Sequence, residues 1–216
     1  QTVGMSISDT TSGLHAFGAI CAALYHRSIT GQGQRIELAL VDCVLWQNEW
    51  ASQHIFLSGG KHDPMRYGNR RPILVPGNVF RGKDGWVTIA SATEGGWENL
   101  ARAMGVPELA KDPRFNSRVA RLSNRDELEN IVGEWVKSFD SVKDVEESLA
   151  DRGGVQCAWV RTWKEMLEDP HVERRGLVSK VDDSILGQTA VMNSPFHLSD
   201  SYSGVRASAP LLGQHT

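Results

Sequence analysis

Asp9 is the residue of this sequence whose type and position are best suited to covalent chemistry. It lies in Ser8–Gly13, SDTTSG, where an acidic residue and small polar residues open a predicted helix. A carboxylate in such a place can attack an activated carbonyl as a nucleophile. It can also cap the helix by accepting hydrogen bonds from backbone N–H groups. Spacing alone favours the cap, and the two roles are compatible because the same amides would orient a nucleophilic carboxylate.

Other catalytic and binding motifs are absent from the sequence. It contains no phosphate loop ending in Gly-Lys-Ser or Gly-Lys-Thr, no Gly-x-Gly-x-x-Gly after a predicted strand, and no Gly-x-Ser-x-Gly elbow. The glycines of Gly31–Gly33 follow a predicted helix and indicate its end. The seven histidines have neither the spacing of a zinc protease nor a cysteine pair beside them, so no metal site is predicted.

The composition is that of an ordinary soluble globular protein, with 40% hydrophobic and 23% charged residues in a chain of 216. A net charge of -3 without a block of Lys and Arg argues against a nucleic-acid partner, which would need clustered positive charge. The longest apolar stretch, Leu14–Tyr25, is too short and too mixed to span a membrane. We therefore expect neither nucleic acid nor membrane as a partner.

The amino-terminal sequence QTVGMSISD has neither the basic region nor the apolar region of a signal peptide. It also lacks an initial methionine, and we expect it to be a cut end. The three cysteines, Cys21, Cys43 and Cys157, lie far apart among apolar residues, which is typical of buried, reduced thiols. These features favour a cytoplasmic location.

The elements that would position Asp9 follow directly after it. Apolar residues at helical spacing predict an amphipathic helix from about Thr11 to Ser28, which the glycines after Thr30 end. Alternating apolar residues predict a strand, Gln34–Leu40, with one buried face. A second helix is expected from near Asp42 to before Gly59.

The middle of the chain predicts a smaller unit with its own hairpin and helices. Ser58–Asn78 holds several glycines and prolines without an apolar period, and is predicted to be a linker. Asn78–Ala90 predicts two strands around an Asp-Gly turn. The helices expected next are Gly95–Met104, Asn124–Ser138 and Val142–Ala150, with Ser123 and Ser141 as the caps of the second and third.

The last part of the chain predicts shorter elements. A strand is expected at Val155–Val160 and a helix opened by a capping box at Thr162–Glu165, which Asp169-Pro170 ends. Two final strands are expected at Gly176–Val181 and Gln188–Met192. The order of elements predicts an α/β fold class, with α/β segments flanking a small α+β domain.

Three parts of the sequence together resemble the family III CoA-transferases. The first is Ser8–His15, SDTTSGLH, and the second is Ala22–Leu40, in which Thr-Gly-x-Gly-Gln precedes the alternating strand. The third is a series of short motifs whose order and spacing match the family, so that the resemblance covers essentially the whole chain. These motifs are Asp84–Val87, Asp112–Phe115, Arg121, Asn124, Gly154-Val155, Asp169–His171, Arg175-Gly176, Ser194–Ser199 and Ala209–Thr216.

The resemblance implies an enzyme that moves coenzyme A from an acyl-CoA to a carboxylic acid, and it matches the catalytic aspartate of the family to Asp9. Its substrates would be a coenzyme A thioester and an acid, with no bound cofactor and no metal. An aspartate needs no general base, because it is already an anion at neutral pH. It can expel the CoA thiolate as a mixed anhydride and recapture it as an aspartyl-CoA thioester.

The resemblance also implies how the chain is divided. Family members are about twice this long, and the match is to their carboxy-terminal half, so the residues that bind coenzyme A are unknown here. Residues 1–58 would be the remnant of a large α/β domain with the catalytic aspartate, and residues 59–77 a linker. Residues 78–152 would form the small α+β domain, and residues 153–216 a return segment towards the large domain.

Two alternatives to the transferase stay open at this point. The racemase branch of the family uses the same aspartate with a histidine from the other half, although Thr10–Gly13 is more similar to the transferases. The chain could also be a truncated, non-catalytic dimerising module. Formyl-CoA transferase carries a run of glycines where this chain has Arg66–Pro72, which argues against formyl-CoA and oxalate as substrates.

The resemblance implies a homodimer, since family III chains thread through one another as linked rings. The Ser58–Asn78 linker is long for a segment without apolar period, and such loops need an external reason to be ordered. We expect a partner chain to supply that reason.

Overall fold

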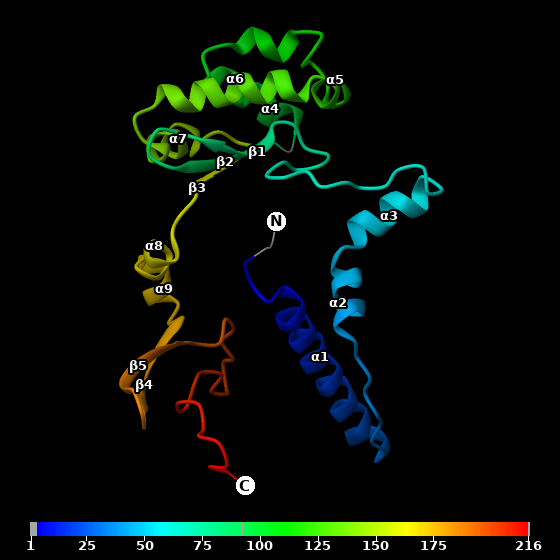
Figure 1. Ribbon diagram of the computed structural model, residues 1–216, viewed down its shortest axis with the longest axis vertical. Helices are drawn as coiled ribbons and strands as arrows, with labels where there is room; N and C mark the ends of the chain where they lie inside the picture. The colour runs from blue at the N-terminus through cyan, green and yellow to red at the C-terminus, as the bar shows by residue number, and fades with distance from the viewer. Residues whose placement is uncertain (1–3, 92, 216) are drawn as a thin grey trace. The chain divides into compact units, whose positions relative to one another are not determined.

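The structure, a computed structural model, describes residues 4–91 and 93–215. Residues 1–3 of the predicted first segment and Thr216 of the last motif lie outside the described residues. The chain divides into two compact units, residues 1–68 and residues 69–216, which are described separately (Figure 1). Both helices and strands are present, as the α/β fold class predicts.

The first unit is helical. Its first helix, α1 (Ile7–Thr30), is longer at both ends than the predicted one, and it packs against α2 (Leu40–Gln47). It ends as predicted at Gly31, which takes the left-handed conformation with φ 75° and donates its N–H to the carbonyl of Arg27 at 2.8 Å. The predicted second helix is divided into α2 and α3 (Glu49–Leu57).

The strand predicted at Gln34–Leu40 is wrong. Residues 32–39 have no regular secondary structure and are exposed, and Leu40 already belongs to α2. Ile36 and Leu38, the expected buried face, are each 39% exposed. A strand needs a neighbour for its backbone hydrogen bonds, and no segment of the described residues pairs with this one.

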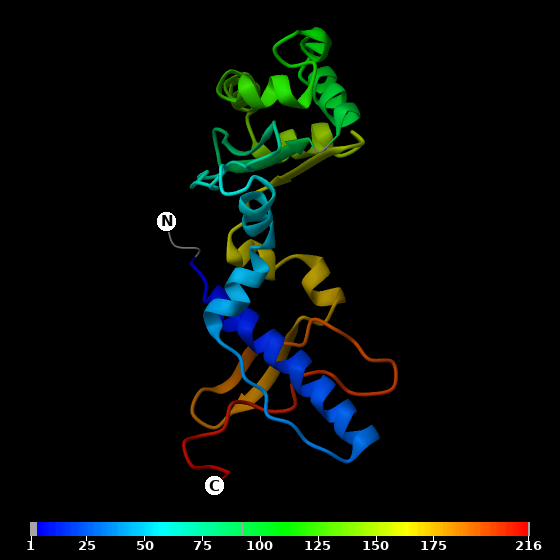
Figure 2. The ribbon, with the colours of Figure 1, turned by 90° about the vertical axis from the view of Figure 1, so that its right-hand side faces the viewer.

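The second unit begins with a small domain built on a three-stranded antiparallel sheet, β1 (Gly77–Arg81), β2 (Trp86–Ser91) and β3 (Val155–Trp159). The predicted hairpin is confirmed as β1 and β2. The predicted strand Val155–Val160 is also confirmed, but it pairs with β2 and therefore belongs to this sheet rather than to a separate return segment. Helix α6 packs on β1, and the two ribbon views show it over the sheet (Figure 1, Figure 2).

The helices of the small domain enclose a continuous apolar core. Trp97, Leu100, Phe115 and Leu128 are all at most 1% exposed, and they pack with apolar side chains of β1 and β2. The helices are α4 (Glu94–Ala103), the 3-10 helix η1 (Pro107–Lys111), α5 (Arg118–Ser123), α6 (Arg125–Ser138) and α7 (Val142–Leu149). The three predicted helices are confirmed as α4, α6 and α7, while α5 was not predicted.

The predicted caps differ in outcome. Ser141 caps α7, because its side chain accepts a hydrogen bond from the backbone N–H of Lys143. Ser123 does not cap α6: it ends α5, its hydroxyl donates to the carbonyl of Val119, and Asn124 is the residue before α6. Asn124 alone separates α5 from α6, so Ser123, which was expected before a helix, lies at the end of one.

Arginines of α5 and α6 hold the second part of the linker against the small domain. Arg125 donates to the carbonyl of Pro72 at 2.7 Å. Arg118 and Arg121 donate to the carbonyls of Ile73 and Val75 at 3.0 Å. The chain itself therefore orders residues 72–75, and the expectation that a partner must do so is wrong for this stretch.

The carboxy-terminal part contains α8 (Trp163–Leu167), α9 (Pro170–Arg174) and the antiparallel pair β4 (Val178–Asp183) and β5 (Gly187–Met192). The predicted capping box between Thr162 and Glu165 is confirmed. The two final strands are confirmed as well. Asp169 is the cap of α9, so Asp169-Pro170 opens a helix that was not predicted.

Candidate functional site

Asp9 lies in the first turn of α1, as the third residue of the helix, and it is exposed. The residue that caps the helix is Ser6, so the interpretation of Asp9 as the cap is wrong. An acidic residue in the first turn still interacts favourably with the positive end of the helix dipole. Asp9 is therefore an exposed carboxylate in the first turn of α1, while a different residue, Ser6, is the cap.

The carboxylate of Asp9 has one side-chain donor within the described part of the chain. The hydroxyl of Ser8 donates to Oδ2 of Asp9 at 3.1 Å. The next hydroxyl, that of Thr10, donates instead to the backbone carbonyl of Ser6 at 2.9 Å. Oδ2 is therefore held by a hydrogen bond, and Oδ1 is left to react.

Small residues leave room along the helix beside Asp9. Gly13 and Ala16 follow at the spacing that places them on the same face of α1. A Cβ added at Gly13 would meet no heavy atom within 4 Å. A bulky electrophile such as a thioester can thus approach the carboxylate along this face.

Ser12 is a buried polar residue one turn after Asp9. It is 4% exposed, and its hydroxyl has no hydrogen-bond partner among the described residues. On the adjoining side of α1, Thr11 donates to the side-chain oxygen of Gln47 in α2 at 3.0 Å. The contacts of α2 therefore fix the rotation of α1 about its axis and, with it, the side from which Asp9 projects.

A cavity of about 440 Å³ lies between α1, residues 37–39 and α2. His15 of α1 and Trp46 of α2 meet there edge to face, with ring centroids 4.8 Å apart. Glu37 and Asp42 also line the cavity, whereas Asp9 does not. Two carboxylates disfavour an anionic substrate, so the geometry does not make this cavity the carboxylate-binding site.

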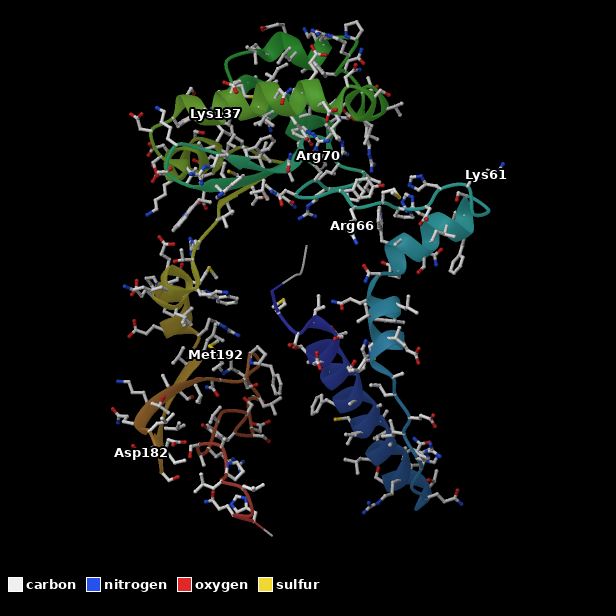
Figure 3. All side chains as sticks on the ribbon, viewed as in Figure 1. Lys61, Arg66, Arg70, Lys137, Asp182 and Met192 are labelled. Atoms are coloured by element: carbon white, nitrogen blue, oxygen red, sulfur yellow. The ribbon has the colours of Figure 1, made fainter. Side chains whose placement is uncertain are left out.

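The linker carries the basic residues Arg66, Arg70 and Arg71, of which Figure 3 labels Arg66 and Arg70. Arg70 is engaged by Asp126 and Glu129 at 2.6 and 2.7 Å. Burial raises the pKa of Glu129, against the opposing effects of Arg70, Arg125 and Asn78. Arg66 forms no ion pair with any described residue.

The cysteines are all unpaired. Cys43 is buried, but Cys21 is exposed on α1, which corrects the expectation of a buried thiol. Burial, together with the nearby Glu146, raises the pKa of Cys157 to about 12, so this thiol is a poor nucleophile. Of the side chains described, no three from His, Cys, Asp and Glu are grouped to hold a metal ion.

None of the helices in residues 4–91 and 93–215 combines the length and the apolar character that crossing a bilayer requires.

Sequence reasoning singled out Asp9 but missed the two serines around it. Ser8 was seen only as part of a turn of small residues, and nothing in the sequence distinguishes a serine that bonds the neighbouring carboxylate from one that faces water. Ser12 is buried on a helix that packs against α2, and such burial depends on tertiary structure.

Comparisons with known proteins agree on one family. The model of CoA-transferase family III matches residues 1–216. The chain is 34% identical over 214 residues to succinyl-CoA–D-citramalate CoA-transferase of Chloroflexus aurantiacus, covering 99% of this chain and 52% of that one. It is 34% identical over 218 residues to succinyl-CoA:mesaconate CoA-transferase of Haloarcula hispanica, with the same coverage of 99% and 52%.

Solved structures give the same result. The crystal structure of a CAIB/BAIF family protein from Brucella suis superimposes with a TM-score of 0.78 and 31% sequence identity, over 100% of this chain and 55% of that one. The chain thus spans about half the length of the relatives it matches.

Proposed function

The chain belongs to CoA-transferase family III, and from this premise we propose that the protein containing it transfers coenzyme A from an acyl-CoA to a carboxylic acid through Asp9. The observation on which the proposal depends is the position of Asp9 in the first turn of α1, exposed and with one oxygen free of hydrogen bonds from described residues. The enzyme binds no cofactor of its own in this proposal, since coenzyme A enters and leaves as part of its substrates.

The proposed reaction begins with attack of Asp9 Oδ1 on the thioester carbonyl of the donor. The C–S bond breaks, the CoA thiolate leaves, and a mixed anhydride remains on Asp9. The thiolate then attacks Cγ of Asp9, the bond between Cγ and Oδ1 breaks, and the donor acid leaves with that oxygen. The acceptor acid reacts with the aspartyl-CoA thioester by the same two steps in reverse, which regenerates the carboxylate.

Dicarboxylic acids are the substrates that we propose to test first. The relatives from Chloroflexus aurantiacus and Haloarcula hispanica are named for succinyl-CoA together with citramalate and mesaconate. Basic residues in place of a glycine run in the linker suit a substrate with a second negative charge. Oxalate with formyl-CoA is the less favoured pair, because Arg66–Pro72 lacks the run of glycines that formyl-CoA transferase carries.

The test is an assay of the full-length protein with succinyl-CoA and a set of mono- and dicarboxylic acids. We expect new acyl-CoA to form with a dicarboxylate, and Asp9→Ala to abolish the transfer. Deuterium from solvent at the α-carbon of the acyl group, without a change of acid, would instead indicate racemase chemistry. Transfer by the Asp9→Ala variant at the rate of the unchanged protein would contradict the role of Asp9.

We further propose that the protein forms a homodimer in a reducing cytoplasm. The support for the dimer is the exposed apolar surface of the first unit, since such surfaces are typical of protein interfaces. Leu14 and Tyr25 of α1 are 69% and 70% exposed, and Trp46 of α2 is 69% exposed. Light scattering of this chain at micromolar concentration should report about twice the mass of 23.8 kDa. A monomer at that concentration would contradict the proposal.

A further inference from the structure

We propose that Ser8 stabilises the negative charge that develops on Oδ2 of Asp9 during thiolate attack, and that it is thus a second residue of the catalytic machinery. The inference rests on the proposed function, because it assigns Ser8 a part in the chemistry of Asp9. Its starting point is the hydrogen bond of 3.1 Å from the Ser8 hydroxyl to Oδ2.

The two oxygens of Asp9 have different fates in the proposed reaction. Oδ1 forms the bond to the acyl carbon and leaves with the donor acid. Oδ2 stays on Cγ throughout, first as a carboxylate oxygen and then as the carbonyl oxygen of the mixed anhydride and of the thioester. When the CoA thiolate adds to Cγ, the electron pair of that carbonyl moves onto Oδ2. The atom that Ser8 contacts is therefore the atom on which negative charge develops.

A hydroxyl in this position acts more strongly on the transition state than on the resting enzyme. In the resting carboxylate the negative charge is shared by two oxygens, whereas the tetrahedral adduct concentrates it on Oδ2. A donor already in place stabilises the adduct without having to reorganise. Ser8 is half-buried and adjoins Asp9 in the chain, so its hydroxyl is held close to Oδ2 before the reaction begins.

The neighbouring hydroxyls do not offer the same contact. Thr10 donates to the carbonyl of Ser6, and Thr11 to Gln47. The side chain of Ser6, which precedes the helix, makes no hydrogen bond to the helix start. Ser6 therefore provides a matched control, since it lies just before the same turn and carries the same hydroxyl but makes no recorded side-chain hydrogen bond to Asp9.

The test compares Ser8→Ala, Ser8→Thr and Ser6→Ala in the full-length protein. Each is mixed with succinyl-CoA alone, quenched at short times, and measured by mass spectrometry for the rate at which the CoA adduct forms. We expect Ser8→Ala to slow adduct formation and kcat by about a hundredfold to a thousandfold at nearly unchanged KM, the range expected for loss of one preorganised donor. Ser8→Thr, which keeps the hydroxyl, and Ser6→Ala should stay within about threefold of the unchanged protein.

The outcomes separate this inference from the proposed function. A Ser8→Ala variant as fast as the unchanged protein overturns the role of Ser8 while leaving Asp9 in place. An equal loss of rate in Ser8→Ala and Ser8→Thr would indicate a structural role and would also overturn the catalytic role of Ser8. A lower final amount of adduct formed at an unchanged rate would do the same. Absence of any adduct in the unchanged protein overturns both the inference and the proposed mechanism.

Discussion

The helices of residues 4–68 and the small domain of residues 69–161 bury their apolar side chains very differently. In the small domain Trp97 and Leu128 are 1% and 0% exposed, and fourteen buried residues form one core. In the helical unit the large apolar side chains of α1 are mostly exposed, and only Ser12 of that helix is buried. The small domain is thus stabilised by its own core, whereas the unit with the candidate nucleophile needs another surface to cover it.

This difference separates stability from chemistry within one chain. Substitutions in the small domain should change the free energy of unfolding, and substitutions at the start of α1 should change activity with little effect on stability.

Asp9→Ala should lower transfer by the full-length protein about 10⁴-fold or more, as expected when a nucleophile is removed. Asp9→Asn should fold normally, since the side chain is exposed and its one recorded hydrogen bond from a described side chain is that of Ser8. Asp42→Asn is a matched control, because it neutralises the acid in the first turn of the neighbouring helix α2. An Asp9→Asn variant that unfolds would show that Asp9 has a structural role and would weaken the division.

Leu128→Ala should destabilise this chain by about 2–5 kcal/mol, because it opens a cavity in a closed core. At concentrations low enough for the chain to be monomeric, the matched substitution Leu14→Ala should change the free energy of unfolding by about 0.5 kcal/mol or less, since Leu14 is exposed and alanine favours the helix. Urea unfolding followed by tryptophan fluorescence measures both. At those concentrations, equal losses from the two substitutions would contradict the exposure of Leu14 in the folded chain.

Arg121→Met should cost about 3 kcal/mol, although methionine fills much of the same space. Arg121 is 3% exposed and donates to the buried carbonyls of Val75 and Phe115, which would lose their donor. It also makes two hydrogen bonds with Glu94, at 2.8 and 3.0 Å. Arg102→Met is the control, since Arg102 is exposed on α4. A loss below about 1 kcal/mol would show that water replaces the missing donor.

Glu94→Gln should have the smallest effect, and one that depends on pH. The hydrogen bond from Arg121 lowers the pKa of Glu94 in the folded chain, so the ionised carboxylate stabilises the fold above the pKa of the unfolded state. That stability is lost as the pH falls through the folded pKa. The gap in unfolding free energy between the unchanged chain and Glu94→Gln should be under about 1 kcal/mol at neutral pH, because the carboxylate is partly solvated, and should close in acid. A difference in unfolding free energy that grows as the pH falls would contradict the conclusion that Arg121 stabilises the ionised form of Glu94.

The sequence predicted the small domain well because its signals are local. The Asp-Gly turn fixes the hairpin, and the amphipathic α6 and α7 pack against it, so pattern and structure agree. The predicted strand Gln34–Leu40 failed for the opposite reason. Its alternation is a signal for a sheet, and a sheet requires a neighbour that no described segment provides.

The candidate site was predictable only in part. The residue type and the helix start identified Asp9, but the position of the cap at Ser6 and the hydrogen bond from Ser8 depend on backbone geometry within one turn. The arginines that hold residues 72–75 are far from them in sequence, so their contacts could not be read from the pattern. These are interactions that tertiary structure alone creates.

The most direct test of the account is to locate the covalent intermediate. The full-length protein is incubated with succinyl-CoA without acceptor, quenched in acid and digested, and the peptide carrying the CoA adduct is identified by mass spectrometry. The account predicts the adduct on the carboxylate of Asp9, its loss on addition of a dicarboxylate, and its absence in Asp9→Asn. An adduct on another residue, or rapid transfer by a protein in which Asp9 is never modified, would contradict it.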